Sequence, residues 1–95
     1  MEKILHLTLK KKWFDMILSG EKTEEYRDIK PYWDKRLIGN SFDIIRFRNG
    51  YKKDSSTFDI ECKGISKGFG WVTWGAPKIN AVYIIKLGKR LDKQP

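Results

Sequence analysis

The chain has 95 residues, a net charge of +8 at neutral pH and 14% aromatic residues, including four tryptophans. This length suits one domain, residues 1–95, with a single modest core, and excludes two. One cysteine, Cys62, excludes an internal disulfide framework, and with His6 as the lone histidine no zinc site is expected. No apolar run is long enough to span a membrane, and we expect a reducing, cytoplasmic location.

The composition also indicates a class of partner. Excess lysine and arginine with many aromatic residues is typical of nucleic-acid-binding proteins, because cations neutralise phosphates and rings stack on bases. Small lysine-rich proteins share this charge without binding nucleic acid. We expect RNA, another nucleic acid or a nucleotide as the partner, a monomer, and no metal, cofactor or membrane contact.

The first predicted elements are a strand and a short helix. Residues 3–10 alternate, with their leucines on one face, which predicts a half-buried strand. Residues 11–19 change to helical spacing, and Gly20 is suited to end this helix in a left-handed conformation.

The stretch from Gly20 to Arg27, Gly-Glu-Lys-Thr-Glu-Glu-Tyr-Arg, is the most unusual in the chain. Read as a strand over residues 22–28, its side chains alternate between two faces. One face would carry Thr23, Glu25 and Arg27, with Lys22 at its start, and the other Glu24 and Tyr26. The first face could hold an anion or a nucleobase, or tune a carboxylate for proton transfer. Alternatively, this is a solvated edge strand whose charges discourage aggregation.

A second short helix is predicted to start at Pro31 and to end at Gly39. It would present a basic and aromatic patch directly after the charged strand. This patch either extends a nucleic-acid surface or is the solvated face of a partly packed helix. Its residues are Tyr32, Trp33, Lys35 and Arg36.

The second half of the chain is rich in predicted strands. Residues 42–48 lead into an Asn49-Gly50 hairpin turn, and a polar loop separates them from an alternating strand over residues 57–66. Residues 81–87 are almost continuously apolar, which predicts a central strand, and residues 89–95 resemble a frayed polar tail.

An aromatic loop over residues 67–78 precedes that last strand. Three glycines and a proline argue against regular structure, and Trp71 and Trp74 are costly to expose. The rings either pack over one end of a barrel or stack on a ligand. With only two helices, the α+β chain must curl its strands into a small barrel or strongly bent sheet.

These motifs resemble the ASCH family, in particular its small phage and bacterial members. The resemblance begins at Leu7-Thr-Leu-Lys and at the aromatic helix from Trp13. It centres on the family's G-x-K-x-x-E-x-R pattern and resumes at Trp74-Gly-Ala-Pro and Val82-Tyr-Ile-Ile-Lys-Leu-Gly. The pattern is matched here by Gly20, Lys22, Glu25 and Arg27.

The resemblance implies a PUA-like fold, an α+β barrel of about five to six strands, with an RNA-binding cleft beside the motif. One branch of the family removes the acetyl group from N4-acetylcytidine with a lysine, a threonine and a glutamate, and ribonuclease activity is ascribed to another. Lys22 matches that lysine, but Glu25 stands where the threonine is expected. Glu61 is only a candidate for the third residue.

Three functional hypotheses follow. The first is a binding module for RNA, a nucleotide or a modified base, built on Lys22, Glu25 and Arg27. The second is a hydrolase of a nucleobase amide or phosphodiester, with Lys22 and Glu25 as its catalytic acid–base pair. The third is a protein-interaction or regulatory domain that docks through the aromatic loop.

Overall fold

The structure is a computed structural model and describes residues 2–91. Within this range the chain forms two α-helices and five strands, which confirms the predicted α+β class with two short helices. The elements in order are β1 (Ile4–Leu9), α1 (Lys11–Leu18), β2 (Glu24–Asp28), α2 (Pro31–Leu37), β3 (Ile44–Asn49), β4 (Thr57–Gly68), a 3-10 turn η1 (Val72–Trp74) and β5 (Val82–Arg90).

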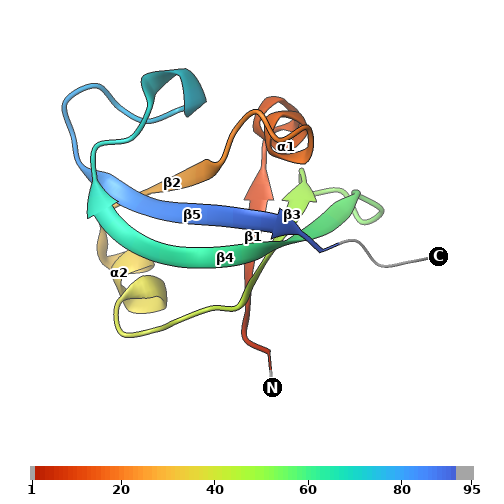
Figure 1. Ribbon diagram of the computed structural model, residues 1–95, viewed down its shortest axis with the longest axis horizontal. Helices are drawn as coiled ribbons and strands as arrows, with labels where there is room; N and C mark the ends of the chain where they lie inside the picture. Colours follow the sequence, from red (N-terminus) through yellow and green to blue (C-terminus); the bar gives the residue numbers. More distant parts are fainter. Residues whose placement is uncertain (1, 92–95) are drawn as a thin grey trace.

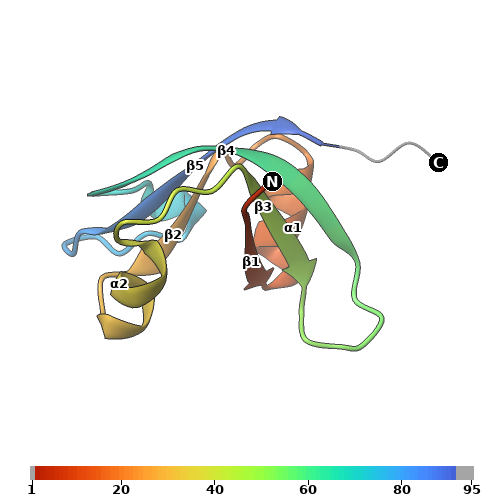
Figure 2. The ribbon, with the colours of Figure 1, turned by 90° about the horizontal axis from the view of Figure 1, so that it is seen from below.

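The strands form one strongly curled sheet in the order β1-β3-β4-β5-β2. β1 and β3 are parallel, and the other neighbouring pairs are antiparallel. β4 bends across the molecule, pairing with β3 near its start and with β5 further along (Figure 2). Register shifts between Ile60 and Gly64, where Gly64 has φ +143°, allow this bend.

The curl produces a half-barrel, not a closed barrel. β1 and β2 are the two edges of the sheet, and no pairing between them occurs in residues 2–91. The helices lie at different ends of the molecule, with α1 beyond the tips of β1 and β3 and α2 under the opposite end of β4 (Figure 1). The sequence therefore predicted the curl correctly, while one seam of the sheet stays open.

The main core fills the concave side. The leucines of β1 are buried as predicted, and Phe14 of α1 packs edge-on against Phe58 of β4 with ring centres 4.9 Å apart. Cys62 is half-buried and lies at the β4 irregularity. The core residues are Leu5, Leu7, Leu9, Phe14, Ile17, Leu37, Ile45, Phe47, Phe58, Ile60, Tyr83, Ile85 and Leu87.

β5 is an interior strand of the sheet, as its apolar run predicted, and its residues 82–85 are buried on both faces. Ile85 lies in the main core, whereas Ile84 belongs to a second cluster with Tyr26 and Ala76, on the side where the aromatic loop packs. β5 continues to Arg90, so the prediction that a polar tail begins at residue 89 placed its start too early. Arg90 is still paired across the sheet with Ile60. Residues 92–95 of that expected tail lie outside the described residues.

Two further sequence expectations concern membranes and metals. No helix in residues 2–91 is long and apolar enough to cross a membrane. Over the same residues, no group of three or more His, Cys, Asp or Glu side chains is placed to hold a metal ion.

Candidate functional site

The charged motif lies where the chain leaves α1 and enters β2. Gly20 has φ +88°, the left-handed conformation predicted for it. The backbone N–H of Lys22 then donates to the carbonyl of Met16 at 3.0 Å, which fixes the turn. In β2, Glu25 lies opposite the core residue Ile85. The motif carboxylate therefore faces the concave side.

Glu25 is held between two cations. Its Oε1 lies 3.0 Å from Lys22 Nζ, and its Oε2 lies 2.8 Å from Arg27 Nη2. Both members of the first pair are buried, with only 2% of Lys22 and 6% of Glu25 exposed. The three residues of the motif thus converge as the strand alternation predicted.

Lys22 is a fully enclosed cation. Its Nζ donates to the carbonyl of Trp74 at 2.7 Å and lies 5.1 Å from the ring centre of Trp13 and 4.8 Å from that of Tyr26. Burial lowers the pKa of Lys22, because the cost of desolvating the ammonium exceeds the stabilisation from Glu25. Lys22 therefore positions Glu25 from behind and offers little surface to a ligand.

Arg27 connects the two edges of the half-barrel. Its Nη2 donates to the carbonyl of Thr8 in β1 at 3.3 Å, and its guanidinium lies 5.2 Å from the ring centre of Trp33 in α2. Its Nε is buried and has no hydrogen-bond partner among the described residues. The side chain keeps 19% of its surface exposed, so of the three motif residues it is the most accessible.

A cleft of about 660 Å³ opens at this seam. This volume falls within the range of ligand pockets, roughly 300–1,000 Å³. β1 supplies one wall, β2 another, and the turn after β3 closes a third side. The lining residues are Thr8, Leu9, Lys10, Trp13, Glu25, Arg27, Asp28, Gly50, Tyr51 and Gly75.

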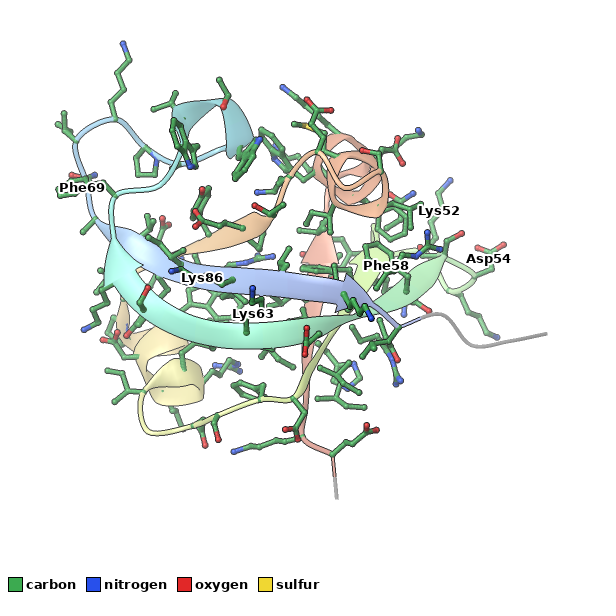
Figure 3. All side chains as sticks on the ribbon, in the orientation of Figure 1. Lys52, Asp54, Phe58, Lys63, Phe69 and Lys86 are labelled. Carbon is green, nitrogen blue, oxygen red and sulfur yellow. The ribbon has the colours of Figure 1, made fainter. Side chains whose placement is uncertain are left out.

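The cleft combines cationic donors, a carboxylate and an exposed ring. Arg27 and Lys10 supply positive charge, and each oxygen of Glu25 retains a lone pair beyond its ion pair. Tyr51 is 88% exposed and follows Gly50, whose φ of +82° forms the predicted turn. Lys52 projects from the same loop (Figure 3). Such a set can hydrogen-bond a base edge, stack a ring and attract a phosphate.

The aromatic loop is attached to the back of this site. The Trp71 N–H donates to the Tyr26 hydroxyl at 3.0 Å, and that hydroxyl donates to Glu24 Oε1 at 2.7 Å. At Gly75, an added Cβ would lie 3.0 Å from the Trp13 ring, so only glycine allows this approach. Trp74 is half-buried against the second cluster, whereas Trp71 is 64% exposed. One tryptophan packs and the other is accessible.

The α2 patch lies behind Arg27 and does not line the cleft. Trp33 is half-buried and in contact with Arg27, whereas Tyr32 is 53% exposed, with the Arg36 guanidinium 3.6 Å from its ring centre. Lys35 is exposed. The patch is therefore continuous with the site through Trp33.

Two candidates from the sequence lie away from the cleft. Thr23 precedes β2, is exposed, and accepts the Leu87 N–H through its carbonyl at 3.0 Å. Glu61 accepts the Lys89 N–H at 3.2 Å and does not line the cleft. Neither Thr23 nor the Glu61 carboxylate therefore lines the cleft.

Several cleft residues were not predicted. Trp13, Tyr51 and the end of β1 were not among the residues predicted for the site. A signal for Tyr51 existed, because an aromatic residue directly after an Asn-Gly turn and before two lysines has no core to enter. Thr8 contributes a backbone carbonyl, for which side-chain patterns give no signal.

No family model, curated protein or solved structure matches this chain. The resemblance to the ASCH pattern therefore rests on the sequence motifs alone and stays a prediction.

Proposed function

We propose that this chain is an ASCH-type, cytoplasmic, monomeric module that binds single-stranded RNA by taking an unstacked nucleotide into the cleft. The observation that carries this proposal is the guanidinium of Arg27, fixed by Glu25 and Thr8 at a cleft between two unpaired sheet edges. An arginine fixed in this way loses little freedom when it binds a phosphate or a base edge.

The three motif residues have different tasks in this proposal. Lys22, which is buried, compensates the charge of Glu25 and holds its carboxylate in place. Glu25 in turn positions Arg27, and Arg27 contacts the ligand. The unused lone pairs of Glu25 accept from an exocyclic amine or ring N–H of the base. Tyr51 stacks on the base, and Lys10 and Lys52 attract the phosphates.

A hydrolase is the second candidate, favoured by the lowered pKa of Lys22 and its 3.0 Å distance from Glu25. A lysine and a glutamate in contact are suited to proton transfer. The geometry argues for binding instead, since Lys22 is 2% exposed and its Nζ is engaged by Trp74. Catalysis would require the aromatic loop to move away from Lys22, so that its Nζ could reach a substrate.

An exposed tryptophan far from the motif would favour the protein-interaction hypothesis. The loop instead contacts Lys22 through Trp74 and Tyr26 through Trp71. In this proposal Tyr32, Lys35, Arg36 and the exposed ring of Trp71 lie outside the cleft and contact only RNA that extends beyond the bound nucleotide.

The proposal is tested by titrating a fluorescein-labelled single-stranded RNA dodecamer and following its anisotropy at several salt concentrations. Binding should weaken with salt, with a log–log slope of roughly −0.7 for each phosphate neutralised. The double variant Lys35→Ala with Arg36→Ala should make the slope shallower without changing base preference. A slope near zero, or equal affinity for the duplex of the same sequence, would contradict the proposal.

A further inference from the structure

β4 has an edge that no strand covers. The strand has 12 residues, and β3 pairs only with residues 57–61. Residues 62–68 pair with β5 on one side, and in the part of the chain that the structure describes no strand pairs with their other side. In an antiparallel strand, about half of the backbone N–H and C=O groups point toward each edge. Several polar backbone groups of β4 therefore face away from β5 here.

A groove of about 470 Å³ lies along this edge. Its second wall is the connection between α2 and β3, which runs beside β4 (Figure 1). The two walls meet at one end, where the Cys62 N–H donates to the Asp43 carbonyl at 2.9 Å. The groove shares no lining residue with the motif cleft. It is therefore a separate site.

The groove has apolar side chains at its base, and on the β4 side it exposes backbone at Gly64. Ile65 lies opposite the core residue Ile85, and Ile38 and Phe42 contribute from the other wall. Ile38 is 57% exposed. Gly64 presents backbone alone, with no atom within 4 Å of the place where a Cβ would stand. An extended chain could approach the strand closely at this point.

We propose that this groove docks an extended, acidic segment of a partner protein, which adds a strand beside β4. Backbone hydrogen bonds to residues 62–68 would supply affinity, and an apolar side chain of the segment would fill the space between Ile65 and Phe42. An unpaired edge beside an apolar pocket is the arrangement that strand addition uses.

The charges around the groove favour an acidic segment. Lys63 and Lys67 are exposed on the edge strand, and Lys3 lies at the other wall, donating to Asn40 Oδ1 at 2.8 Å. Two nearby carboxylates keep their negative charge, and each accepts a hydrogen bond from within the protein. Asp34 accepts the Tyr83 hydroxyl, and Asp43 accepts the Lys3 N–H at 2.9 Å.

The same lysines argue against a second copy of this chain as the occupant. Two β4 edges paired antiparallel about Ile65 would place Lys63 of each copy near Lys67 of the other. Like charges opposite each other destabilise a strand pair. The segment therefore comes from a different protein.

The probe is a phage-displayed library of random dodecapeptides, panned on the full chain. Enriched peptides should alternate acidic and apolar residues. Synthesised with fluorescein, they should bind in anisotropy titrations and protect from hydrogen exchange those backbone amides of residues 63–68 that do not pair with β5. This exchange pattern tests the wild-type protein directly and requires no variant to fold.

A charge-reversal pair then tests the electrostatic part. Lys63→Glu with Lys67→Glu should weaken peptide binding by at least about fivefold, from lost attraction and new repulsion. The control, Lys53→Glu with Lys78→Glu, changes net charge equally away from the groove and should stay within about twofold. The proposal fails if no peptide is enriched, if the enriched peptides are basic, or if they protect residues outside this edge. RNA binding is measured separately on the wild-type protein, because both variants lower the net charge by four and would weaken any electrostatic binding of RNA. Loss of either interaction in the wild-type protein leaves the other proposal standing.

Discussion

Replacing Lys22 with methionine should destabilise the fold strongly, although the two side chains have similar length. The ammonium is 2% exposed and contacts Glu25 Oε1 at 3.0 Å and the Trp74 carbonyl at 2.7 Å. Methionine supplies neither a charge nor a donor. Glu25 would keep only Arg27 as its partner, and the Trp74 carbonyl would lose its contact with Nζ.

The magnitude follows from these two losses. Breaking a buried ion pair by removing one partner costs about 3–5 kcal/mol. A buried acceptor left unpaired costs about 1–3 kcal/mol, partly offset because a buried ammonium no longer needs desolvation. A net loss of roughly 3–5 kcal/mol is a large part of the 5–15 kcal/mol typical of a domain. For a domain of this size it lowers the Tm by at least about 12 °C.

Urea unfolding followed by tryptophan fluorescence measures this loss. The chain offers a matched control in Lys11, which pairs with Asp15 at 2.6 Å but is 78% exposed. Lys11→Met should cost less than about 1 kcal/mol. Adding Glu25→Leu to Lys22→Met should recover little of the loss, because Arg27 then loses the carboxylate that pairs with it at 2.8 Å. If Lys22→Met is as mild as Lys11→Met, then Lys22 does not hold the motif together.

Three further predictions concern the same region. Gly70→Ala should destabilise the aromatic loop by about 1–3 kcal/mol, because its Cβ would lie 2.4 Å from the Tyr26 ring. Gly68→Ala, which meets only the Ile84 tip at 3.3 Å, should be milder in the same thermal melts. Burial raises the pKa of Tyr26 to about 12 in the folded state, so its contribution is complete below pH 10 and should be lost between pH 10 and 12. Tyr26→Phe should flatten this alkaline fall in denaturation curves, and equal slopes would refute the assignment. Incubation with N4-acetylcytidine should give no deacetylation, because Lys22 is enclosed and no hydroxyl replaces Glu25. Robust turnover abolished by Lys22→Ala would instead establish the hydrolase.

Local patterns predicted most of the elements and the central part of the site. The period-two leucines of β1 and the glycine stops after both helices are local signals, and they appear where expected. Glu25 and Arg27 were correctly placed together, because strand alternation relates residues two apart. The same rule placed Glu24 and Tyr26 on the other face, where they share a hydrogen bond.

What the patterns missed depends on contacts between distant segments. The burial of Lys22 requires the Trp74 carbonyl, 52 residues away, and a lysine in a charged stretch otherwise resembles a surface residue. The cleft exists because β1 and β2 do not pair, which is a property of the whole sheet. Thr23 was misplaced because β2 begins one residue after it. Glu61 was a candidate by residue type only, and its position on β4 places it elsewhere.

The most direct test of the central claim compares two paired arginines. Arg27 binds Glu25 at the cleft, whereas Arg46 binds Asp59 at 2.7 and 2.9 Å and does not line the cleft. Anisotropy titration of single-stranded RNA should show Arg27→Gln weakening affinity by about tenfold or more, since a charge-assisted contact is lost. Arg46→Gln removes the same charge and should stay within about twofold. Equal losses for the two variants, or none for Arg27→Gln, would contradict a nucleotide site at this cleft.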